Sequence, residues 1–345
     1  MGTTEDRALG AMAGLAIGDA LGMPTQMLPR AAVARLFPAL SWFEDGPAEN
    51  RISAGWQAGR VTDDTEQALI LARLLVDGRG HTDPHGLAAE LASWARHAEQ
   101  DGSEQLGPSS RRAIEGVMAG IPVEKAGCRG TTDGAAMRIA PVGIATGPND
   151  LAVLVDRVEE ACLVTHHTGV AIAGAAAVAA AVSAGVAGWP QEESLGLAIR
   201  AAEMGAGRGH YAAGADVARR IAWAAGLVRD ASGEKVADLV AGLVGTGVAT
   251  EQAVPAAFAL AGRWPADPWQ ACLTAASLGG DADTIAAIAG AVGGSWTGVS
   301  AFPEAALATI EEVNRLGLAG VAQRLLPLRT AHGAADPRAR GAAPE

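Results

Sequence analysis

The first segment of the chain places a glycine at every fourth position, at Gly10, Gly14, Gly18 and Gly22. In an α-helix this spacing puts all four residues on one face. Because glycine weakens a helix, such a stripe is typical of a helix whose backbone lies directly against another backbone. We therefore expect residues 4–21 to form a helix that packs closely against a second one.

The rest of the chain also favours helices. Hydrophobic residues make up 49% of its 345 residues but aromatic residues only 4%, so most apolar side chains are those of Ala, Leu, Val and Ile. Ala and Leu are the strongest helix formers. No segment shows the sustained alternation of β-branched and polar residues that is typical of strands. The sequence predicts an all-α fold.

Helical periodicity recurs along most of the chain. Besides the first helix, we expect helices over residues 64–77, 84–97, 108–119, 151–163, 168–187, 192–204, 213–229, 234–245, 251–262, 268–277, 284–292 and 303–316. A short apolar helix before Pro141 is expected to end there, and residues 24–60 are expected to form a long irregular loop. No repeat of 20–50 residues and no long polar linker is evident. We expect one domain over residues 1–330 and a disordered tail over residues 331–345.

The charge and the cysteines bear on partners and location. A net charge of −12 with no stripe of Lys and Arg disfavours nucleic acid as a partner. Cys128, Cys162 and Cys272 form no CxxC pair and no evident disulfide framework. Acidic Glu5 and Asp6 precede the first apolar run, where a signal peptide would be basic. We expect a cytoplasmic protein, and the sequence carries no signal for its oligomeric state.

Residues 169–187 carry no charge and are nearly long enough to cross a membrane. They are mostly Ala and Gly, which suits a helix buried among other helices better than one that faces lipid. We therefore expect a core helix and no membrane association.

Two carboxylates stand side by side in the segment Thr62-Asp63-Asp64-Thr65. With Glu66 the segment also fits a capping box at a helix start. Capping needs one side-chain oxygen, whereas two carboxylates and two hydroxyls are crowded into this turn. Adjacent carboxylates repel each other unless a cation or protons compensate their charge. The segment is either a helix cap or part of a cation site.

A second acidic segment, GGDADT at residues 279–284, also precedes an apolar helix. Its two glycines allow a tight bend, so that Asp281 and Asp283 can point the same way. Taken alone it is also more typical of a cap. Together the two segments offer four carboxylates and three hydroxyls, the oxygen ligands that Mg²⁺ prefers. Two such ions, roughly 3.5–4 Å apart, can activate a water and hold a substrate oxygen.

These motifs resemble the ADP-ribosylglycohydrolase family. Five segments match in order: GAMAGLAIGDALGMPTQ at 10–26, VTDDT at 61–65, GTTDGAAMRIAPVG at 130–143, THHTGVAIAGAA at 165–176 and LGGDADTIAAIAGA at 278–291. The resemblance implies a compact, multi-helical orthogonal bundle with a centre of two Mg²⁺ or Mn²⁺ ions. It places the metal ligands at Thr62, Asp63, Asp64, Asp281, Asp283 and Thr284. Asp63 or Asp64 would position or deprotonate the attacking water and is the catalytic candidate.

The resemblance also implies a substrate site. It places His166 beside the substrate and makes Gly130, Thr132 and Gly134 part of a substrate loop, whose backbone N–H groups suit a diphosphate. A glycine-rich turn without a ligand is the alternative for this loop. Asp19 is a charge within an apolar segment, and it is either a carboxylate bonded to neighbouring backbone or a wall of the site.

Gln26, also placed at the substrate site, departs from the family pattern. Many relatives carry at this position a Glu that is thought to act in the chemistry, and Gln cannot exchange a proton as a carboxylate does. Three alternatives follow. Asp63 or Asp64 takes the acid–base role with a metal-bound water, Glu44 or Glu49 enters from the loop, or hydrolysis is weak.

We expect a metal-dependent hydrolase that cleaves the glycosidic bond at C1 of an ADP-ribosyl group, on a protein side chain or a small molecule. No ring pair that would sandwich an adenine is evident, and Tyr211 is the only tyrosine. A glycosidase for a smaller ribosylated metabolite or nucleoside derivative is therefore the alternative. A non-catalytic binding or structural member is disfavoured, because a scaffold gains little from four clustered carboxylates.

Overall fold

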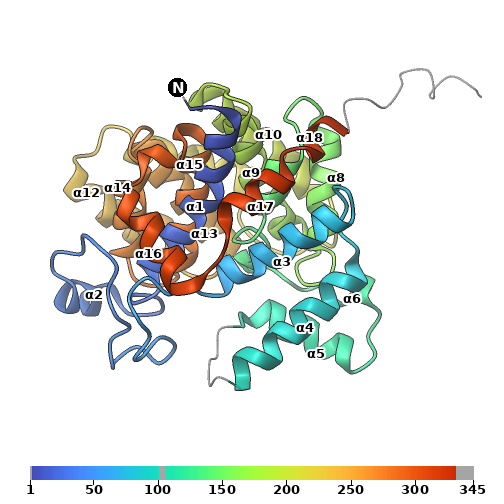
Figure 1. Cartoon of the computed structure of the whole chain (residues 1–345), viewed down its shortest axis with the longest axis horizontal. Coiled ribbons are helices and arrows are strands. Elements are labelled where there is room, and N and C mark those ends of the chain that lie inside the picture. Colours follow the sequence, from blue (N-terminus) through green and yellow to red (C-terminus); the bar gives the residue numbers. More distant parts are fainter. Residues whose placement is uncertain (1, 101–105, 332–345) are drawn as a thin grey trace, which may run out of the picture.

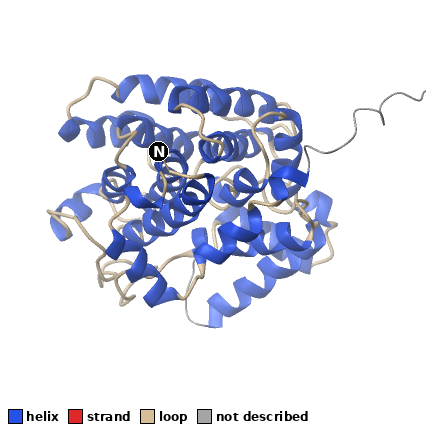
Figure 2. Cartoon of the chain, turned by 45° about the horizontal axis from the view of Figure 1, so that its top comes forward, coloured by secondary structure: helices blue, strands red, loops and turns tan. Residues whose placement is uncertain are grey.

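The computed structural model describes residues 2–100 and 106–331, and the regular elements in these ranges are helices. Figure 2 shows helices joined by loops and no strand in the described part. The prediction of an all-α fold is confirmed. All but the first residue of the predicted tail, 331–345, lies outside the described residues.

Two helices pack backbone to backbone at the centre of the fold, α1 (Thr4–Gly22) and α15 (Ala282–Thr297). A Cβ added at Gly14 or at Gly18 would lie 2.1 Å from a backbone oxygen of α15. The glycine stripe thus removes the side chains that would hold the two helices apart, as the spacing predicts. Helix α15 carries Asp283 of the second acidic segment, and α1 carries Asp19, which accepts hydrogen bonds from the first, so this contact also sets the geometry of the candidate site.

The uncharged, alanine-rich segment forms helix α9 (Gly169–Val186), which is long and apolar enough to cross a membrane by length and composition, yet is 94% buried inside the protein. Helices α7 (Ala140–Ala145), α8 (Leu151–Cys162) and α10 (Gln191–Ala206) pack against it. Small side chains let these helices approach closely. Helix α9 is therefore the core helix that the sequence predicts.

The remaining helices surround this centre (Figure 1). Helix α13 packs on both α11 and α14, and all three contact the central helices, while α4, α5 and α6 share a smaller apolar cluster beside α3. Their bounds are α2 (Arg30–Leu36), α3 (Asp63–Asp77), α4 (Pro84–Gln100), α5 (Pro108–Met118), α6 (Val123–Ala126), α11 (Val217–Val228), α12 (Gly233–Leu239), α13 (Thr250–Arg263), α14 (Pro268–Ala276), α16 (Glu304–Asn314), α17 (Leu318–Leu325) and α18 (Leu328–Ala331).

Three expectations about elements are wrong. Pro141 lies in the first turn of α7 and begins a helix rather than ending one, because a missing N–H costs nothing at that position. The segment 24–60 contains the short helix α2. The helix expected over 284–292 continues to Thr297, since its later glycines pack against α1 and do not end it.

Candidate active site

The Thr62–Thr65 segment forms the start of α3, and Asp19 of α1 holds it in place. The two carboxylate oxygens of Asp19 each accept from the Thr62 N–H at 3.0 Å, and one also accepts from the Thr65 N–H at 3.1 Å. Burial raises the pKa of Asp19 to about 6, against hydrogen bonds from Thr65 and Thr62 that lower it. Asp19 is therefore a buried carboxylate bonded to neighbouring backbone, and it positions the first acidic segment from behind.

The second acidic segment is shaped by glycines. Gly279 and Gly280 adopt left-handed backbone conformations, with φ of 69° and 65°, which glycine takes up without strain. The turn leaves Asp281 as the N-cap of α15 and Asp283 in its first turn. A Cβ added at Gly22 would lie 2.3 Å from the Asp283 Cα. Helix α1 thus fixes this segment as well as the first.

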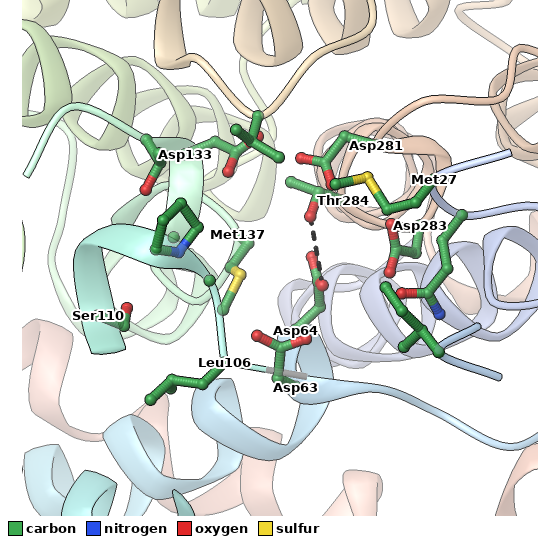
Figure 3. A pocket seen from close by; sticks show the side chains of 17 residues that line it. Met27, Asp63, Asp64, Leu106, Ser110, Asp133, Met137, Asp281, Asp283 and Thr284 are labelled. Carbon is green, nitrogen blue, oxygen red and sulfur yellow. Dashed lines mark hydrogen bonds between the residues drawn. The ribbon is translucent and has the colours of Figure 1, made fainter. Parts of the chain in front are cut away.

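The two acidic segments meet, although they are about two-thirds of the chain apart. The Thr284 hydroxyl donates to the Asp64 carboxylate at 3.3 Å, across 220 positions of sequence. Asp63, Asp64, Asp281 and Asp283 all line one cavity of about 160 Å³ (Figure 3). The expected meeting of the segments is confirmed, and the assignment of these residues as metal ligands stays a prediction.

The carboxylates in this cavity perturb one another. Burial, and next the charge of Asp283, raise the pKa of Asp64 well above its usual range. Burial and the charge of Asp281 do the same to Asp283, and burial also raises the pKa of Asp281. Groups with raised pKa values in one pocket are typical of functional sites. The cavity therefore favours either protons or a cation beside these side chains.

The donor set fits a hard divalent cation. Asp64 Oδ1, Asp281 Oδ2 and Asp283 Oδ1 are buried and accept no hydrogen bond from the described residues. Unpaired buried acceptors are costly, and carboxylate oxygens are the ligands that Mg²⁺ and similar ions prefer. Within residues 2–100 and 106–331, no group of three or more Asp, Glu, His or Cys side chains is placed so that it could hold a metal ion as the side chains stand. Asp64 instead accepts hydrogen bonds from the hydroxyls of Thr62 and Thr284.

Asp133 is a site residue that the sequence interpretation missed. It is buried, its Oδ2 accepts no hydrogen bond within the described part, and it faces the other acids from the opposite wall (Figure 3). Burial and the charge of Asp281 raise its pKa well above the usual range. The available signal was a lone carboxylate in the glycine-rich segment before α7. The remaining lining residues outside the predicted set are Met27, Ile52, Leu106, Gly107, Pro108, Ser110, Met137 and Val248.

The predicted substrate residues divide into two groups. Gln26, Thr132 and Gly134 line the cavity, whereas Gly130 and His166 lie behind its wall. The Gln26 amide nitrogen donates to the Met23 carbonyl at 3.1 Å, which leaves its second N–H and its amide oxygen as the remaining polar groups of the side chain.

The alternative carboxylates for the position of Gln26 lie elsewhere. Glu44 and Glu49 are exposed and are not among the described residues that line the cavity. Glu49 forms an ion pair with Arg35 at 3.4 Å. The structure therefore does not bring either loop glutamate to the site.

His166 is completely buried and reaches the cavity only through another residue. Its Nε2 lies 2.9 Å from Thr132 Oγ1, and its Nδ1 lies 2.7 Å from Thr165 Oγ1. Burial, and next the charge of Arg138, lower the pKa of the imidazole well below its usual range. His166 is therefore neutral at pH 7, and its direct contact with a substrate stays a prediction.

Comparisons with known proteins show which family the chain resembles in sequence and fold. A family model described as ADP-ribosylglycohydrolase matches residues 1–335. The chain is similar to YegU of Escherichia coli strain K12, with 35% identity over 90% of this chain and 93% of that protein. It is also 29% identical to the ADP-ribosylarginine hydrolase Tri1 of Pseudomonas putida, over 86% of this chain and 72% of Tri1. A solved structure titled ADP-ribosylglycohydrolase-related protein complex aligns with a TM-score of 0.69 and 26% identity, covering 95% and 99% of the two chains.

Proposed function

The chain belongs to the ADP-ribosylglycohydrolase family of hydrolases, and on that premise we propose that it cleaves the glycosidic bond at C1 of an ADP-ribosyl group with the help of two divalent cations, Mg²⁺ or Mn²⁺. The observation that carries the proposal is the meeting of Asp63 and Asp64 with Asp281 and Asp283 at one cavity. The substrate is an ADP-ribosylated protein or a ribosylated small molecule. Because Tri1 is an ADP-ribosylarginine hydrolase, an arginine linkage is the first to test.

The residues of this chain have distinct proposed roles. The cations would be held by Thr62, Asp63, Asp64, Asp281, Asp283 and Thr284. When bound, such a pair of cations polarises substrate oxygens and activates a water. Asp63 is the only one of the four clustered carboxylates that is partly exposed, so it is the best placed to orient the attacking water. Asp133 faces them across the cavity, and burial and the charge of Asp281 raise its pKa, so it is our candidate for the acid–base role that Gln26 cannot take.

The proposal is tested by measuring the release of ADP-ribose from ADP-ribosyl-arginine, ADP-ribosyl-serine and O-acetyl-ADP-ribose. We expect turnover of at least one substrate with Mg²⁺ or Mn²⁺, its loss with a chelator, and its return when the cation is restored. Asp283→Asn should lower turnover by at least about 10–100-fold, the loss that is usual even for residues that only support a metal ligand. Asp230→Asn, a change of the same kind at an exposed position, should leave turnover unchanged. No turnover by the cation-loaded protein would contradict the proposal.

A second candidate, a glycosidase for a smaller ribosylated metabolite, is favoured by the cavity itself. Its volume of about 160 Å³ lies below the roughly 300–1,000 Å³ that is usual for sites of larger ligands. The described lining residues include no aromatic side chain that would stack on adenine. The release of ribose from free nucleosides, measured under the same conditions, separates the candidates, because turnover of nucleosides alone would favour this one. A non-catalytic member would turn over neither class.

A further inference from the structure

A row of hydrogen bonds, buried at its centre and partly buried at its two ends, runs from α3 to the Gly130–Gly134 loop. At one end, Gln67 Nε2 donates to the Asp63 carboxylate at 3.3 Å, and Gln67 Oε1 accepts from Arg138 Nη1 at 2.9 Å. The other guanidinium nitrogen, Nη2, donates to Thr165 Oγ1 at 2.7 Å. Arg138 thus connects the first acidic segment to the residues that support the loop.

The direction of each hydrogen bond beyond Arg138 can be derived. A guanidinium only donates, so Thr165 Oγ1 accepts from it. The single proton of the Thr165 hydroxyl then goes to His166 Nδ1, which lies 2.7 Å away. Arg138, Thr165 and His166 are all completely buried. If Nδ1 carried the proton instead, the Thr165 hydroxyl would be a buried donor with no acceptor among its described neighbours, which is costly.

The proton of the imidazole therefore lies on Nε2. That N–H donates to Thr132 Oγ1 at 2.9 Å, so the Thr132 oxygen is used as an acceptor. The proton of the Thr132 hydroxyl remains available. Thr132 is half-buried and lines the cavity, so this proton is directed toward whatever binds there.

We propose that Arg138, acting through Thr165, fixes His166 in the Nε2–H tautomer and so makes the Thr132 hydroxyl a dedicated hydrogen-bond donor to an acceptor oxygen of the ligand. Arg138 is then a positioning residue, because it touches no ligand itself. The identity of that ligand, an ADP-ribosyl group with its phosphate and ribose oxygens, rests on the proposed function. The tautomer does not.

Two observations support the fixed geometry of this row. A Cβ added at Gly134 would lie 2.8 Å from His166 Cε1, and one at Gly130 would lie 2.0 Å from the Thr165 carbonyl oxygen. The two glycines therefore let the loop press directly on the row. The imidazole is also held neutral by its burial and by the charge of Arg138, so it has a single proton to place.

The tautomer is tested on the full chain without any ligand, by ¹⁵N NMR of the ring nitrogens, with the His166 signals assigned from His166→Gln. We expect an unprotonated Nδ1 and a protonated Nε2. Thr165→Val removes the hydroxyl but keeps the shape of the side chain, and it should move the proton toward Nδ1. Thr165→Ser should restore the wild-type signals. A wild-type ring protonated at Nδ1, or a tautomer unchanged by Thr165→Val, would overturn the proposal.

The role of Thr132 is tested by calorimetric titration of ADP-ribose in the presence of Mg²⁺, on variants whose thermal unfolding shows that they are folded. Thr132→Val should weaken binding by about tenfold, the loss of one hydrogen bond. Thr165→Val should weaken it comparably, and the double variant should bind no more weakly than Thr132→Val, because Thr165 acts through Thr132. Additive losses would overturn the proposal. Failure of the wild type to bind ADP-ribose would overturn the proposed function, while the NMR result still decides the tautomer.

Discussion

Asp64 is buried among like charges, so its replacement should stabilise the metal-free protein while it weakens the binding of cations. Burial and the charge of Asp283 raise its pKa, so at pH 7 the free energy of unfolding of the metal-free protein is reduced. We expect Asp64→Asn to raise this free energy by roughly 1–2 kcal/mol and to remove the stabilisation that Mg²⁺ gives. Thermal unfolding with Mg²⁺ and with a chelator measures both. A lower melting temperature of the metal-free variant would show that repulsion does not dominate at this position.

His166 should make the protein sensitive to mild acid. Its folded-state pKa is lowered, whereas an unfolded histidine titrates near 6.5, so below about pH 6.5 the unfolded chain binds the additional proton. Stability contributed by the neutral ring is therefore lost as pH falls, by up to about 1.4 kcal/mol per pH unit. We expect melting temperatures between pH 7.5 and 5.0 to fall less steeply for His166→Gln than for the wild type. The buried carboxylates with raised pKa values change the stability with the opposite sign, but they are present in both the wild type and His166→Gln. Equal slopes of melting temperature against pH in the two proteins would therefore refute a lowered pKa of His166.

At this scale the sequence predicted the acids better than their partners. Asp63 and Asp64 lie at the start of α3, and Asp281 and Asp283 lie at the start of α15. The local sequence therefore already places the two carboxylates of each pair at the same end of one helix. Arg138 was not singled out, because it meets Gln67 across 71 positions and Thr165 across 27. Such partnerships arise from packing between elements, which no local pattern encodes.

The contact between α1 and α15 leads to a prediction about elements. A Cβ at Gly14 would lie 2.1 Å from a backbone oxygen of α15, and neither helix backbone can move without disturbing the core. We expect Gly14→Ala to lower the free energy of unfolding by about 1–3 kcal/mol. Gly226→Ala in α11 is the matched control, since a Cβ there meets nothing within 4 Å. It should raise the free energy by about 0.5–1 kcal/mol. Chemical denaturation measures both, and losses of equal size would contradict the backbone contact.

The sequence predicted that α1 lies against another backbone, but it did not identify which one. Both α9 and α15 are rich in small residues, and only the folded chain shows the stripe of α1 facing α15. Pro141 was misplaced for a related reason. A proline inside an apolar run can stand in the first turn of a helix or just after the last turn of one. Which of the two occurs depends on where the preceding loop is held by the rest of the fold.

For the whole molecule, cation binding should stabilise the fold as one unit. The candidate site joins α1, α3 and α15, which all belong to the same apolar core. A cation that binds only the folded protein, at a concentration 100 times its dissociation constant, raises the free energy of unfolding by about 2.7 kcal/mol. We expect Mg²⁺ to raise the melting temperature by a few degrees in a single calorimetric transition, and a chelator to reverse the shift. Asp283→Asn should abolish the shift, whereas Asp230→Asn should retain it. Two transitions, only one of them shifted by Mg²⁺, would contradict both a shared core and the expected single domain over residues 1–330.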